Sequence, residues 1–206
     1  VSCHSNQCLL CSSTYSNSVQ PDLLPSHVTH FISFFYIPRH FIPPMSTPTK
    51  RRLMKDLKDL ENTKNRTVFA APLQDDILTW CALIIGPKDT PFEDATFSMT
   101  MSFDESYPCT PPTCKFISKV YHPNIYANGD LCLDILTNRW SPTFNVMTVL
   151  MSVQSMLNDP NVQSPANLEA ANLFDNDRKC YVRRVRDCVE KSWYDLDSEI
   201  EKNEND

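Results

Sequence analysis

The 206-residue sequence predicts an α+β domain, with one helix at its start, then a run of short strands, then further helices. Three observations carry this prediction. Apolar residues recur with helical spacing near residue 50, alternate with period two near residue 100, and return to helical spacing after about residue 141. A hydrophobic content of 41% is sufficient for a packed core, which excludes a wholly disordered chain.

Charge divides the chain into three segments. Residues 1–44 have no net charge, residues 45–194 have a net charge of −1, and residues 195–206 have a net charge of −5. We expect a leader over 1–44, either disordered or read through from upstream of a natural start at Met45. A balanced domain over 45–194 and an acidic tail over 195–206 follow it.

Composition excludes several functions. No apolar run reaches the ~18–20 residues that a membrane-spanning helix needs, so we expect no membrane association. A net charge of −6 argues against direct binding of nucleic acid, and 2 glycines leave no Gly-rich phosphate loop. The leader contains Cys3, His4, Cys8 and Cys11, but the second half of a zinc site is missing, so we predict no bound metal.

The first helix has a start signal and a buried stripe. Thr47 is a suitable N-cap, and Pro48 suits the first helical position. Leu53, Leu57 and Leu60 follow with helical spacing, which predicts a helix of about 14 residues.

The first turn of this helix is basic. Lys50, Arg51 and Arg52 lie at the end where the helix dipole disfavours positive charge. They form either a solvated face or a partner site, and the unfavourable electrostatics favour the partner site.

Strands are predicted next. Residues 79–85 form a β-rich run that ends at Gly86-Pro87, residues 97–103 alternate between apolar and polar side chains, and prolines precede a third run over 113–120. Their short spacing predicts an antiparallel meander. After about residue 141, apolar residues indicate a helix over 146–157 and a last helix over 181–193.

The residues that carry chemistry lie between the last strand and the later helices. Asn128-Gly129 is a strong turn signal, and Cys132 follows it, with Asn124 and His122 eight and ten residues before the cysteine. In a cysteine hydrolase, His122 would be the general base for Cys132. However, Pro123 biases His122 toward extended backbone, which favours a structural role for the histidine.

This stretch resembles the active-site signature of ubiquitin-conjugating enzymes, in which His-Pro-Asn is followed after eight residues by a cysteine. Further motifs occur in the order found in that family: Gly86-Pro87, Thr90-Pro91-Phe92, Tyr107-Pro108, Pro111-Pro112, Trp140-Ser141-Pro142 and Asp159-Pro160-Asn161. The resemblance covers about residues 45–194. It implies a catalytic domain with an N-terminal helix, a four-stranded antiparallel meander, a long active-site loop and C-terminal helices.

The resemblance also implies an activity. Members of the family accept ubiquitin from an activating enzyme as a thioester on the cysteine, here Cys132, and pass it to substrate lysines with a ligase. Asn124 matches the residue credited with stabilising the oxyanion, directly or by holding the loop. No cofactor is expected on the chain, because ATP is consumed upstream.

Other positions match the family's supporting residues: Tyr121, His122, Pro123, Asp134 and Ser164. Asp134 could serve only to fix the local backbone. Many relatives have an aspartate at the position of Ser164, so the resemblance implies that lysine activation depends on the substrate or the ligase.

The resemblance implies two partner surfaces. Arg51, Arg52 and Lys55 match the helix face presented to the activating enzyme and to ligases. Trp140-Ser141-Pro142 matches a loop contacted by RING-type ligases, and Cys109 stands in the other ligase loop, where many relatives have an aromatic residue.

Within the family, the chain most resembles the branch that modifies histones and the DNA-replication clamp, through Arg51-Arg52-Leu53-Met54 and Ser164-Pro165-Ala166-Asn167. This resemblance implies roles in DNA repair and chromatin, and residence in the nucleus and cytoplasm. The acidic tail is either a solubilising tail or a site that attracts basic substrates such as histones. The alternative function is a non-catalytic ubiquitin-binding adaptor.

Overall fold

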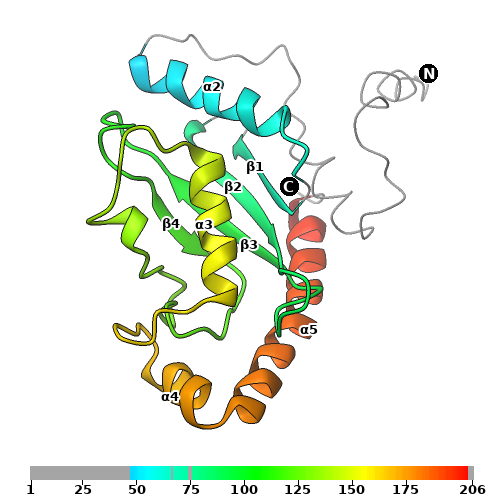
Figure 1. Cartoon of the computed structure of the whole chain (residues 1–206). Coiled ribbons are helices and arrows are strands. Elements are labelled where there is room, and N and C mark those ends of the chain that lie inside the picture. The colour runs from blue at the N-terminus through cyan, green and yellow to red at the C-terminus, as the bar shows by residue number, and fades with distance from the viewer. Residues whose placement is uncertain (1–46, 66, 74–75, 204–206) are drawn as a thin grey trace, which may run out of the picture.

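The structure is a computed structural model that describes residues 47–65, 67–73 and 76–203, with side chains as far as residue 193 (Figure 1). The predicted leader, including its candidate metal cluster, lies outside the described residues. Within the described part of the chain, no helix is both long enough and apolar enough to cross a bilayer.

The first helix, α2, spans Pro48–Glu61, as the capping signals predict. The Thr47 side chain accepts a hydrogen bond from the Lys50 N–H at 3.3 Å, which satisfies one of the free amides of the first turn. Leu53, Leu57 and Leu60 are buried. Asp56 is also buried, although it is charged, and its partners are described with the site.

The four strands form one antiparallel sheet in the order β1-β2-β3-β4, so the predicted meander is confirmed. The strands are β1 Val68–Leu73, β2 Asp76–Ile85, β3 Thr96–Ser102 and β4 Thr113–Phe116. Sequence patterns did not locate β1, which has a proline and two alanines instead of a clear alternation.

The last strand is shorter than the run over 113–120 suggested. The backbone N–H groups of Ile117 and Ser118 both donate to the Ser98 carbonyl, at 2.9 and 3.3 Å. Two successive amides on one acceptor cannot continue the regular ladder, so the chain bends away after Phe116.

Three helices follow: α3 Val146–Asn158, α4 Leu168–Asn176 and α5 Arg178–Asn203. In Figure 1, α3 lies across the sheet, with α2 above it and α4 below it, and α5 runs along the side next to β3. In the hydrophobic core, buried residues of α3 such as Leu150 belong to one cluster with buried residues of the sheet such as Trp80 and Phe97.

Helix α5 extends further than its apolar stripe predicted. The indole of Trp193 donates to the Asp94 carbonyl at 2.8 Å, and the Ser192 hydroxyl oxygen accepts from the Thr96 N–H at 3.2 Å. Beyond these contacts, the backbone stays helical to Asn203, so the boundary at residue 195 is a change of charge and not of backbone structure.

We predict that Leu150→Ala lowers the free energy of unfolding by about 2–5 kcal/mol, because Leu150 is fully buried and its truncation leaves a cavity. Leu168→Ala is the matched control, since Leu168 is 76% exposed, and it should change this free energy by less than about 0.5 kcal/mol. Urea unfolding followed by circular dichroism measures both. Equal losses would contradict the assignment of the core.

Candidate functional site

The loop that carries Cys132 is folded back on itself by a tight turn. The Tyr126 N–H donates to the Asp130 carbonyl at 2.9 Å, and the Gly129 N–H donates to the Tyr126 carbonyl at 2.9 Å. Gly129 has φ of 90°, and a Cβ atom there would lie 2.2 Å from the Phe116 carbonyl oxygen, so only glycine fits. The turn therefore reverses the chain and returns Cys132 toward Asn124.

The turn brings the backbone of Cys132 beside that of Asn124. The Cys132 N–H donates to the Asn124 carbonyl at 2.9 Å, while the cysteine itself stays partly exposed. The backbone of Cys132 is thus held by a hydrogen bond while the residue stays partly exposed, and this combination suits a nucleophile.

Asn124 is buried and its side-chain amide is engaged at both ends. Its Nδ2 donates to the Asn161 carbonyl at 2.7 Å, and its Oδ1 accepts from the Asn161 N–H at 2.7 Å. Next to it, the Pro123 carbonyl accepts from the N–H groups of Ala166 and Asn167. These bonds join the Cys132 loop to the segment over 161–167, which carries Ser164.

Ser164 is exposed on that segment. A hydroxyl at this position cannot supply the negative charge of a carboxylate. Asn161 belongs to the Asp159-Pro160-Asn161 motif, and it anchors Asn124 through its backbone N–H and carbonyl. A backbone contribution of this kind cannot be predicted from the residue type.

His122 is fully buried, and both ring nitrogens have partners. Nδ1 accepts from the Asn124 N–H at 3.0 Å, so the ring proton lies on Nε2 and is donated to the Met156 carbonyl at 2.9 Å. Burial lowers the pKa of His122 to about 4. A neutral imidazole with both ring nitrogens hydrogen-bonded is a poor general base. This geometry favours a structural role for His122 over the role of general base in a cysteine hydrolase.

Tyr121 packs against α5 rather than standing free in the loop. Its ring centroid is 6.0 Å from that of Tyr181, and the Arg184 guanidinium carbon lies 5.7 Å from the Tyr121 centroid. Burial raises the pKa of Tyr121, with a further contribution from Glu169. The geometry supports Tyr121 as a packing residue behind the site.

Asp134 opens a short 3₁₀ helix over Asp134–Leu136 and is exposed. Its backbone carbonyl accepts from the N–H groups of Thr137 and Arg139, at 3.0 and 2.9 Å. The contact between its carboxylate and the Arg139 Nε is 4.0 Å long and solvent-exposed, so it contributes little. Asp134 thus orders the backbone just after Cys132.

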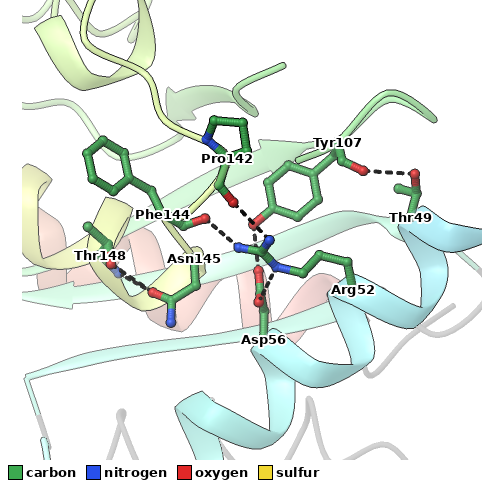
Figure 2. Close-up of polar contacts among 8 residues, drawn as sticks. All are labelled: Thr49, Arg52, Asp56, Tyr107, Pro142, Phe144, Asn145 and Thr148. Atoms are coloured by element: carbon green, nitrogen blue, oxygen red, sulfur yellow. Dashed lines mark hydrogen bonds and ion pairs between the residues drawn. The ribbon is translucent and has the colours of Figure 1, made fainter. Parts of the chain in front are cut away.

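The predicted partner residues fall into two groups. Arg51, Lys55 and Cys109 are exposed. Arg52 differs, because its guanidinium turns inward, to the Asp56 carboxylate and to the backbone oxygens of Pro142 and Phe144 (Figure 2). Trp140 is also partly buried, and its indole donates to the Pro108 carbonyl at 2.9 Å.

The sequence analysis did not predict that Asp56 and Tyr107 belong to the hydrogen-bond network around the Arg52 guanidinium. The Tyr107 hydroxyl donates to the Asp56 carboxylate, and burial raises the pKa of Tyr107. One signal could have found Asp56, because it follows Leu53 by three residues and precedes Leu60 by four, on the apolar face of the helix. A carboxylate on that face predicts a buried partner.

Comparison with known proteins connects this site to one family. A family model described as ubiquitin-conjugating enzyme matches residues 52–189. The chain is also similar to proteins named "Ubiquitin-conjugating enzyme E2 2". It is 60% identical to that of Candida albicans over 151 residues, which cover 73% of this chain and 84% of the relative. It is 58% identical to that of Trichoderma harzianum over 151 residues, which cover 73% of this chain and the full length of the relative.

We predict that His122 titrates near pH 4 in the folded protein, against an ordinary value of 6.5. As the pH falls, the unfolded state binds this proton at a higher pH than the folded state does. The contribution of His122 to the free energy of unfolding is therefore fully present above about pH 6.5 and is lost between pH 6.5 and 4, by up to about 3 kcal/mol. The chemical shift of the His122 ring proton, followed by NMR, measures the midpoint. A midpoint near 6.5 would contradict the buried, neutral assignment.

Proposed function

Because this chain belongs to the ubiquitin-conjugating enzyme family, we propose that Cys132 accepts ubiquitin as a thioester and delivers it to substrate lysines. Membership of the family implies ubiquitin, an activating enzyme and a ubiquitin ligase as partners. The observation that carries the assignment of the nucleophile is the bond from the Cys132 N–H to the Asn124 carbonyl. It holds a partly exposed thiol beside the asparagine that the family signature requires.

Charging exchanges one thioester for another. The Cys132 thiolate attacks the ubiquitin thioester on the activating enzyme, a new C–S bond forms, and the cysteine of the activating enzyme leaves as a thiolate. We propose that this chain needs no cofactor for either step, since the thioester itself stores the acyl-transfer potential and ATP is consumed by the activating enzyme.

Discharge forms an amide. The lysine amine attacks the thioester carbonyl, the C–N bond forms, the C–S bond to Cys132 breaks, and the amine loses a proton. At pH 7 only about one lysine in 2,500 is deprotonated at its reference pKa. Ser164 supplies no carboxylate near this approach, so we propose that the substrate or the ligase provides the missing proton acceptor.

Asn124 has two ways to assist this step. Its bonds with Asn161 hold the Cys132 loop against the segment over 161–167. The side-chain nitrogen of Asn124 carries two hydrogens, and one of them is donated to the Asn161 carbonyl. The other can be donated to the oxyanion of the tetrahedral intermediate. We assign Asn124 to both tasks.

We propose that the partner surfaces lie on α2 and on the two loops near it. Arg51 and Lys55 are exposed charges for the activating enzyme and for ligases, while Cys109, Ser141 and Pro142 lie in the loops that a RING-type ligase contacts. Cys109 takes the place of an aromatic residue found in many relatives, so the ligase must accept a small side chain there.

The finer role is also a proposal. The resemblance to the branch that acts on histones and the replication clamp supports a function in DNA repair and chromatin, with residence in the nucleus and cytoplasm. The acidic segment after residue 194 continues helix α5 as far as Asn203. We propose that its negative charge attracts basic substrates such as histones. Retention of both Cys132 and Asn124 argues against a non-catalytic adaptor.

We predict that the wild-type chain, incubated with activating enzyme, ATP and ubiquitin, forms an adduct that a thiol reagent removes on a gel, and that Cys132→Ala forms none. Cys109→Ala is the matched control, because it removes an exposed thiol and should still charge. A well-folded wild-type protein that forms no adduct would refute the proposal.

We predict that Asn124→Ala charges at a near-normal rate and discharges to lysine about 10²–10³-fold more slowly, the cost of losing one oxyanion donor. Asn124→Asp keeps the acceptor for the Asn161 N–H but has no amide hydrogen. It should therefore discharge at least as slowly as Asn124→Ala, because it also loses the bond to the Asn161 carbonyl. Pulse-chase discharge to free lysine measures both variants. Slow charging with normal discharge would contradict the assigned role.

We predict that replacing the six acidic residues of 195–206 with Asn or Gln slows histone ubiquitination several-fold at low salt. The difference should shrink as ionic strength rises above about 0.15 M, where exposed charges are screened. This variant keeps the length of the segment, so it isolates the charge. An unchanged rate at low salt would leave the segment with a solubilising role only.

A further inference from the structure

Arg52 is the one residue that joins helix α2 to the loop after Trp140 by side-chain donors, among the hydrogen bonds found in the described residues (Figure 2). Its Nε lies 2.8 Å from the Asp56 carboxylate. Its two terminal nitrogens donate to the Pro142 carbonyl at 2.9 Å and to the Phe144 carbonyl at 2.6 Å. The side chain as a whole is 22% exposed, so most of its surface is removed from solvent.

The same carboxylate fixes a second loop. Asp56, whose side chain is 1% exposed, also accepts a hydrogen bond from the Tyr107 hydroxyl. The Arg52 guanidinium carbon lies 5.5 Å from the Tyr107 ring centroid, close enough for a cation–π contact. Tyr107 precedes the segment that carries Cys109, so one buried ion pair reaches both predicted ligase loops.

Two further bonds close this arrangement. The Thr49 hydroxyl lies within hydrogen-bond distance of the Glu105 and Tyr107 carbonyls, at 2.7 and 2.9 Å. The Trp140 indole donates to the Pro108 carbonyl. Helix α2 therefore holds the loop over 105–109, and that loop holds the start of the loop over 140–144.

Arginine is required for this geometry. A guanidinium presents its donors in a rigid planar fork, which here reaches one carboxylate and two carbonyls at once. A lysine ammonium is a compact charge on a flexible stem, so it can pair with Asp56 but cannot fix both carbonyls in the same directions. The arrangement thus depends on the identity of residue 52 and not only on its charge.

We propose that Arg52 is a positioning residue, which sets the relative placement of the loops carrying Cys109 and Trp140-Ser141-Pro142 and thereby the affinity for the ligase. This inference rests on the proposed function, because it assigns those loops to ligase binding. It departs from the expectation that Arg52 contacts partners directly, which stays the proposal for the exposed Arg51 and Lys55.

The test compares Arg52→Gln with Arg52→Lys and with Lys58→Gln. Lys58 is an exposed base on the same helix, so its variant removes the same charge without touching the loops. Two quantities are measured: hydrogen exchange of the Phe144 amide, which donates to the Ser141 carbonyl, and lysine discharge with and without an added RING domain. The RING domain is one that accelerates discharge from the wild-type thioester.

For Arg52→Gln we expect exchange at Phe144 to rise at least about tenfold and the KM for the RING domain to rise about tenfold, since two hydrogen bonds from a charged donor are lost. The maximal ligase-stimulated rate should stay within about twofold of wild type, and the KM of each variant is taken from the increase over that variant's own ligase-free discharge. Arg52→Lys should recover part of the KM, and Lys58→Gln should resemble wild type.

A raised KM without a change in Phe144 exchange would show that Arg52 contacts the ligase directly and would overturn the inference. Unchanged KM and exchange would overturn it equally. The exchange measurement needs no thioester, so it tests the positioning role even if Cys132 fails to charge. That failure would instead contradict the proposed function.

Discussion

The buried carboxylate of Asp56 is the constraint on which the arrangement of the partner surfaces depends. A buried charge is costly unless it is paired and hydrogen-bonded, and Asp56 meets both conditions through Arg52 and Tyr107. Such a pair adds little net stability compared with apolar packing, but breaking it is expensive. The pair therefore gives one placement of α2 and the two nearby loops a lower free energy than placements in which the pair is broken.

A second set of bonds acts at the other end of the same stretch of chain. Asn124 is tied to Asn161, and the Cys132 N–H is tied to Asn124. The segment from Asn124 to Phe144 is thus held near its beginning by an amide and at its end by a guanidinium. Between these anchors, Cys132 keeps a fixed backbone and a partly exposed thiol. This suits a carrier that must present a thioester to other proteins.

The sequence predicted the fold well, because local signals determine most of its elements, whereas the roles of Cys132 and Asn124 came from the resemblance and stay predictions. Capping at Thr47 and the leucine stripe located α2 within its observed bounds, and the turn at Asn128-Gly129 placed Cys132 beside Asn124. Local signals could not show where β4 ends, because the carbonyl that ends it belongs to Ser98 in another strand. They also placed the end of the last helix near a change in charge, whereas the helical backbone continues to Asn203.

The role of Arg52 was the least predictable from sequence. It stands in a row of basic residues that suggests one exposed face, yet two of its three acceptors are backbone carbonyls about ninety positions away. Backbone acceptors leave no trace in the residue types around them. The roles of Asn161 toward Asn124 and of Met156 toward His122 were hidden for the same reason.

The proposed function depends most on a single cysteine, among the nine in the chain, as the carrier of ubiquitin. Burial already sets Cys114 apart, since it raises the pKa of that thiol to about 12, and Cys188 is shifted in the same direction. Cys109 is exposed, and Cys132, Cys180 and Cys188 are partly exposed. Peptide mass spectrometry of the charged protein, with free thiols blocked before the thioester is opened, locates the modified residue directly. We expect ubiquitin to protect Cys132 alone from the blocking reagent. Protection of Cys109 or Cys180 in its place would contradict this expectation.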